Sequence, residues 1–193
     1  MNTTAILSII ALFFAIVVIV ILVAIKILSV KNSILTDRNK IYQEFIKRTS
    51  VKKFITILDN VGDRAVDSDI KLMLQKYFEL VLCKIDSKKI PNLLIDLEQS
   101  KHSGVLMECL RQAVAKDDGL FGIALANNID NFKNKLVIQD FISNLPPEQQ
   151  TKQYQAALNV VKEDYNRNLI DQPSEYRKPV EEAIKEFQKK IIV

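Results

Sequence analysis

The sequence predicts an all-α protein in which a single transmembrane helix near the N-terminus is followed by a multi-helix domain. Residues 5–25 are apolar and uncharged, with Ser8 as their one polar side chain. The 193 residues include only four glycines and five prolines. No Asn-Gly or Asp-Gly pair follows an alternating run that would indicate a hairpin, and Asp118-Gly119 lies between helical patterns. These observations favour helices joined by short loops over strands.

The apolar segment is long enough to cross a membrane. As a helix, residues 5–25 extend roughly 31 Å, about one hydrocarbon core. A cleaved signal peptide has a basic start, a shorter apolar run and a small-residue cleavage site. Residues 1–4 carry no Lys or Arg, and residues 24–28 show no Ala-x-Ala pattern. A core helix of a soluble domain is seldom apolar on every side. We therefore expect a signal-anchor helix.

Charge on the two sides of this segment predicts its orientation. No Lys or Arg precedes it, whereas residues 26–53 contain eight basic and two acidic residues. Because positively charged flanks stay in the cytoplasm, we expect a single-pass protein of the cell inner membrane with its N-terminus outside and its C-terminal domain cytoplasmic. The juxtamembrane basic residues are Lys26, Lys31, Arg38, Lys40, Lys47, Arg48, Lys52 and Lys53.

The net positive charge of the chain comes from this juxtamembrane segment. Residues 54–193 contain 19 basic and 21 acidic residues. Nucleic-acid binding requires a basic face on the folded part, so we expect no nucleic-acid partner. Each cation beside an anionic leaflet contributes about 1 kcal/mol of attraction. The basic segment therefore either sets topology alone or also binds anionic lipid.

Three regions follow from these patterns. Residues 1–31 form the anchor, residues 32–49 a basic helical stalk, and residues 50–193 a soluble all-helical domain. Apolar residues of the stalk recur at helical spacing and no Gly or Pro interrupts residues 1–61, although a bend near residues 31–33 stays open. The face of the stalk consists of Ile34, Leu35, Ile41, Tyr42, Phe45 and Ile46.

Capping residues and prolines divide the domain into short helices. Ser50 is expected to cap the first of them, Asp67 or Ser68 the second, and Asp130 the sixth. Pro179 leaves the start of the last helix ambiguous, because residues 174–178 form either a separate turn or a kinked extension. The expected helices cover residues 51–60, 70–85, 91–100, 103–116, 119–128, 131–144, 147–168 and 180–191.

The helix expected over residues 70–85 is apolar on most sides and should lie at the centre of the domain. The whole set of helices forms either a compact bundle or a short α-solenoid. Similar segments at residues 54–59, 93–97 and 137–142 hint at a solenoid, because the aspartates within them are 37 and 44 residues apart. These spacings are near the length of a two-helix repeat.

Residues capable of catalysis or ligand binding are few. His102, the sole histidine, lies in the turn 100–104, where we expect it to be exposed and loosely paired with Glu98. Cys83 and Cys109 lie in apolar helical patterns and are expected to be buried, reduced thiols. One His and two Cys without metal-ligand spacing make no zinc site, and four glycines build no phosphate loop. We therefore predict no catalytic, cofactor-binding or metal residues.

A stripe of small residues runs along the apolar segment. Thr4, Ser8, Ala11 and Ala15 follow at spacings of 4, 3 and 4 residues. Small side chains let two helix backbones approach closely within a membrane. The stripe predicts a contact with the helix of a membrane partner or of a second copy.

Three functional hypotheses remain. In general design the chain resembles single-pass subunits of bacterial inner-membrane assemblies that present a helical domain to the cytoplasm. The first hypothesis is a non-enzymatic scaffold or adaptor in a secretion, motility, division or other envelope complex, with the bilayer and one or more membrane or cytoplasmic proteins as partners. The second is a protein that responds to anionic lipid through its basic segment. The third is an enzyme whose site is assembled from scattered residues.

Overall fold

A computed structural model of the protein describes residues 3–47, 50–115 and 117–191. Helices make up 82% of the structure, and no strand occurs in these three ranges. The predicted all-α class, with one long apolar N-terminal helix before a helical domain, is confirmed. The α-helices are α1 (Thr3–Ile46), α2 (Val51–Asp59), α3 (Ser68–Leu82), α4 (Ile90–Glu98), α5 (Ser103–Val114), α6 (Leu120–Ala126), α7 (Phe132–Ser143), α8 (Pro147–Asp164) and α9 (Ser174–Ile191).

Helix α1 joins the apolar segment and the stalk without interruption. It contains 44 residues, which corresponds to about 66 Å. Residues 16–45 of this helix are long and apolar enough to cross a membrane, with a mean hydropathy of 2.2. Its side chains from Ile16 to Asn32 are exposed in the isolated chain. The continuity follows from the absence of Gly and Pro, so the bend left open near residues 31–33 does not interrupt the helix.

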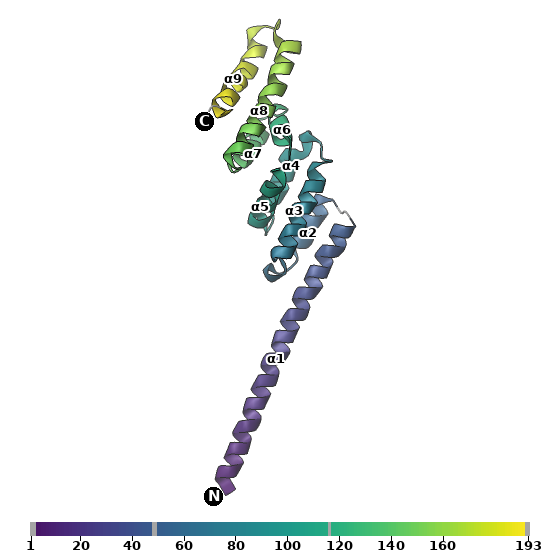
Figure 1. The fold of residues 1–193 in the computed structure, drawn as a ribbon, viewed down its shortest axis with the longest axis vertical. Helices are drawn as coiled ribbons and strands as arrows, with labels where there is room; N and C mark the ends of the chain where they lie inside the picture. The colour runs from purple at the N-terminus through teal and green to yellow at the C-terminus, as the bar shows by residue number, and fades with distance from the viewer. Residues whose placement is uncertain (1–2, 48–49, 116, 192–193) are drawn as a thin grey trace.

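The remaining helices follow one another away from α1 along the long axis of the molecule. The N-terminus lies at one end and the hairpin of α8 and α9 at the other (Figure 1). Helix α2 packs on α4 and α4 on α7, while α3 packs on α5, α6 on α8, and α8 on α9. Each helix thus contacts near neighbours in chain order, which is the arrangement of a short α-solenoid rather than a closed bundle.

The three similar segments of the sequence lie in α2, α4 and α7, which are neighbours in this stack. The aspartates of these segments nevertheless make different hydrogen bonds. The Asp59 carboxylate accepts hydrogen bonds from the turn after α4, whereas Asp140 accepts two bonds through its backbone carbonyl. The spacing therefore matches the stacking of the helices but not a repeated role for the acid.

Three local expectations require correction or refinement. Asn131, not Asp130, caps α7, because its side chain accepts a hydrogen bond from the Asn134 N–H at 3.1 Å. Helix α3 is not enclosed, since the side chains of Leu72 and Leu80 are 59% and 49% exposed. Apolar residues on most sides predicted a central helix, but in the described chain no element covers this side of α3. Helix α9 runs through Pro179 from Ser174, so the ambiguous residues 174–178 belong to the last helix.

Two short 3-10 turns and one π-helical turn connect these elements. The turn η1 (Asp63–Ala65) follows α2, and η2 (Ser87–Lys89) precedes α4. The π-helical turn η3 (Tyr165–Leu169) extends α8 close to the length expected from the sequence. The turn η1 also contacts α1.

Candidate functional site

The C-terminal part of α1 is packed onto the domain. Ile41 of α1 is fully buried. The Phe45 ring meets the Tyr77 ring of α3 edge-on at 6.3 Å, and Tyr77 stacks on Phe54 of α2 at 4.5 Å. Burial raises the pKa of Tyr77 to about 12. We call this contact between α1 and the residues of α2, η1 and α3 that it touches the helix–domain joint.

Ion pairs and hydrogen bonds also connect α1 to the domain at this joint. The guanidinium of Arg38 pairs with Asp67 at 2.8 Å and with Asp69 at 3.1 Å. Asp67 also caps α3 by accepting a hydrogen bond from the Ile70 N–H at 3.2 Å. On the neighbouring position of α1, the Asp37 carboxylate accepts the Gly62 N–H at 3.3 Å. Because the planar guanidinium can bridge two carboxylates, Arg38 orients α1 against the start of α3.

Several of the juxtamembrane basic residues are paired within the protein. Lys40 pairs with Asp37 at 3.3 Å, and Lys47 pairs with Glu44 at 3.2 Å. Lys53 pairs with the same Glu44 at 3.6 Å. Together with Arg38, these side chains contribute to the joint and its surroundings. Lys52 is exposed on α2, and Arg48 lies outside the described residues. Lys26 and Lys31 are the basic residues closest to the apolar segment.

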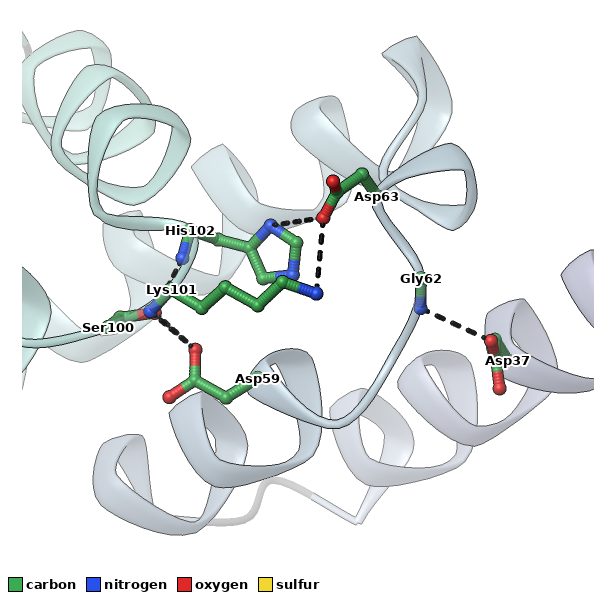
Figure 2. A network of polar contacts seen from close by, with 7 residues as sticks. All are labelled: Asp37, Asp59, Gly62, Asp63, Ser100, Lys101 and His102. Atoms are coloured by element: carbon green, nitrogen blue, oxygen red, sulfur yellow. Dashed lines mark hydrogen bonds and ion pairs between the residues drawn. The ribbon is translucent and has the colours of Figure 1, made fainter.

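A second polar network holds the turn after α4 against the end of α2 (Figure 2). The Asp59 carboxylate accepts hydrogen bonds from the Ser100 hydroxyl at 2.6 Å and from the Lys101 N–H at 2.9 Å. The Ser100 hydroxyl oxygen in turn accepts the His102 N–H at 3.1 Å. One carboxylate of α2 therefore organises the whole turn between α4 and α5.

His102 is buried, which corrects the expectation of an exposed residue paired with Glu98. Its side chain is 7% exposed, and its Nδ1 lies 3.9 Å from the Asp63 carboxylate (Figure 2). The same carboxylate pairs with Lys101 at 3.3 Å. The hydrogen bonds to Asp59 hold the turn between α4 and α5 against the domain, and the His102 imidazole therefore lies next to η1. Nε2 of His102 has no hydrogen-bond partner among the residues that the structure describes.

The cysteines differ from each other. Cys109 is buried as expected, and its thiol donates to the Lys71 carbonyl at 3.5 Å rather than to His102. Burial raises the pKa of Cys109 to about 11, so the thiolate needed for nucleophilic chemistry is disfavoured. Cys83 is exposed, so the expectation of a second buried thiol was wrong. It follows the last turn of α3 and lines a shallow hollow of about 320 Å³.

The predicted small-residue stripe lies in a part of α1 whose side chains are not described. Thr4, Ser8, Ala11 and Ala15 belong to the helix, but only its backbone is described there. The contact stripe therefore stays a prediction. In the described ranges, no three His, Cys, Asp or Glu side chains form a group suited to a metal ion.

Comparisons with models of known families, with curated proteins and with solved structures gave no match. What the geometry defines is a class of architecture. One long apolar helix near the N-terminus is docked, through a buried joint, onto an elongated helical domain. The joint and the turn network are built from residues that position helices.

Proposed function

We propose that the chain is a non-enzymatic, single-pass scaffold or adaptor that holds its helical domain at the cytoplasmic face of a bacterial inner membrane. One observation carries the proposal: the helix that contains the apolar segment continues unbroken into the buried helix–domain joint. A domain attached in this way keeps a set height and direction relative to the membrane. A flexible linker would provide neither.

The exposed apolar surface of α1 supports membrane insertion. Large apolar side chains between Ile16 and Leu28 are mostly more than half exposed in the isolated chain. Burying one such side chain is worth about 1.5–3 kcal/mol. A bilayer buries them all together, whereas a soluble protein would have to cover them with other elements.

The arrangement of charge supports the proposed orientation. Lys26 and Lys31 directly follow the apolar segment, and the residues before it carry no Lys or Arg. Cations close to the end of a membrane helix favour the cytoplasmic side. The pairing of Arg38 and Lys40 inside the protein leaves this argument intact, because Lys26 and Lys31 are closest to the bilayer.

The shape of the domain supports a role in binding other proteins. An elongated stack of helices exposes a large surface for its size, and proteins built in this way use such surfaces for binding. The most conspicuous reactive residues, His102 and Cys109, are both buried, and the Cys109 thiol donates to the Lys71 carbonyl rather than to His102. This favours the scaffold over an enzyme with a scattered site.

The proposal is tested by purifying the tagged full-length protein in mild detergent and measuring its native mass. We expect a stoichiometric complex with at least one other membrane or cytoplasmic protein. A matched preparation of the Arg38→Gln variant separates the role of the joint, because loosening α1 should weaken the complex while the chain stays in the membrane. A lone monomer in the wild-type preparation and in crosslinked cells would contradict the scaffold.

A further inference from the structure

The turn η1 brings the helical domain back toward the end of the apolar segment. It packs against α1, and a hollow of about 200 Å³ separates the two. The Gly62 N–H, held by Asp37 at 3.3 Å, fastens η1 at this position (Figure 2). Its lining includes Val30, Ile34 and Asp37 of α1 and Asp63 and Arg64 of η1.

The hollow lies at the outer edge of the headgroup layer, provided that α1 spans the membrane as proposed above. Val30 and Ile34 lie five and nine residues beyond Ile25, which is about 8–14 Å along the helix. The interfacial layer adds about 5–8 Å to each side of the hydrocarbon core. Long basic side chains cover the remaining distance by extending toward the interface.

Positive charge is in excess at this height. The two carboxylates that line the hollow are already paired, Asp37 with Lys40 and Asp63 with Lys101, each at 3.3 Å. The exposed side chains of Lys26, Lys31 and Arg64 have no carboxylate partner within the described chain. Arg64 is the unexpected member of this group, because it lies 33 residues beyond Lys31 in the sequence and reaches the site only through the fold.

We propose that Arg64, together with Lys26 and Lys31, binds the anionic headgroups of the bilayer that holds α1. Guanidinium and ammonium groups pair with lipid phosphates by charge-assisted hydrogen bonds. Arg64 belongs to the domain, whereas the two lysines belong to the membrane helix. Headgroups held between them connect the domain to the membrane at a second point and oppose tilting about α1.

Hydrogen exchange in lipid nanodiscs tests this contact on the full-length protein. One set of discs contains phosphatidylcholine alone, and the other contains about one-third phosphatidylglycerol. We expect amide exchange over residues 62–66 to be about fivefold slower in the anionic discs, the effect of about one cation at the surface. High salt should remove the difference, because it screens exposed charges.

Matched variants test whether Arg64 causes the slower exchange in anionic discs. Arg64→Gln should abolish the slowing and Arg64→Lys should keep most of it, whereas Lys178→Gln on α9, at the far end of the domain, should behave as wild type. If the protein enters the discs but residues 62–66 exchange equally in both lipids, or if Arg64→Gln keeps the full effect, the headgroup contact is refuted and the scaffold stands. If the protein fails to enter the discs, the anchored scaffold fails as well.

Discussion

Replacing Gly122 with alanine should separate two helices of the stack. Gly122 of α6 faces α8 so closely that a Cβ atom there would lie 1.9 Å from the Gln153 carbonyl oxygen and 3.0 Å from the Ala157 nitrogen. Both are backbone atoms, so no change of side-chain rotamer relieves the clash. Restoring an ordinary contact requires the helices to move apart by about 1.5 Å.

The cost of this movement has two parts. Overpacking of a well-packed core costs about 1–3 kcal/mol. The movement also breaks the 2.9 Å hydrogen bond from the Gly122 N–H to the fully buried Gln153 side chain. Leaving that amide unpaired costs about 1–3 kcal/mol. Alanine recovers about 1 kcal/mol through its higher helix propensity, so we expect a net loss of about 1–5 kcal/mol.

Urea unfolding of the full-length protein in detergent, followed by circular dichroism, measures this loss. Gly104→Ala is the matched control, because no atom lies within 4 Å of a Cβ at that position of α5. This control should stabilise the domain by about 0.4–1 kcal/mol. A Gly122→Ala variant as stable as wild type would refute the close packing of α6 on α8 from which the cost was derived.

Three further predictions concern the joint, the turn network and the buried thiol. Ile41→Ala removes a fully buried side chain from the joint and should lower the free energy of unfolding by about 2–4 kcal/mol. Limited proteolysis should then cleave the chain between α1 and α2 faster than in the wild type, and an unchanged cleavage rate would contradict a packed joint. Asp59→Ala leaves the buried Ser100 hydroxyl without its acceptor and should cost about 1–3 kcal/mol in urea unfolding. The control Asp96→Ala replaces the corresponding acid of α4 and should change stability by less than about 0.5 kcal/mol. Equal effects of the two variants would contradict the role of Asp59 in holding the turn. Burial raises the pKa of Cys109 from 9.0 to about 11, so the stability gained from its neutral thiol is present below pH 9 and lost as the pH rises through about 11. In urea titrations across this pH range, the free energy of unfolding of Cys109→Ala should decline less with pH than that of the wild type. An identical decline would count against a buried thiol.

Local signals in the sequence predicted most of the secondary structure. Asp67 caps α3 and Pro147 opens α8, both at the expected places. The absence of Gly and Pro favoured one helix for the apolar segment and the stalk, with a bend near residues 31–33 left open, and the structure has one continuous helix. Periodicity and caps act over one or two helical turns, so they can be read without knowledge of the fold.

The roles of particular side chains depended on contacts between distant segments and could not be predicted in the same way. Arg38 was counted among cations close to the membrane, but its partners Asp67 and Asp69 lie about 30 residues away in sequence. Nothing in the sequence around Arg64 points to the membrane, because only the packing of η1 on α1 brings it near the apolar segment. His102 is buried because Asp59 draws its turn inward, and residues in turns are ordinarily exposed.

The faces of α3 also could not be assigned from the sequence alone. An apolar pattern identifies which side chains favour burial, but not whether a neighbouring element is present to cover them. Leu72 and Leu80 are exposed for this reason, and Cys83 is exposed beyond the end of the helix. Because several adjacent faces of α3 are apolar, the pattern could not indicate which one packs on α5.

The central claim, that α1 anchors the domain at the cytoplasmic side of a membrane, is tested most directly by the native thiols. Cys83 is exposed, whereas Cys109 is buried with a raised pKa and should react only after unfolding. A membrane-impermeant maleimide should leave intact bacteria expressing the full chain unlabelled, and should add one label per chain to membranes from broken cells. Labelling of Cys83 in intact cells, or recovery of the chain in the soluble fraction, would contradict the claim.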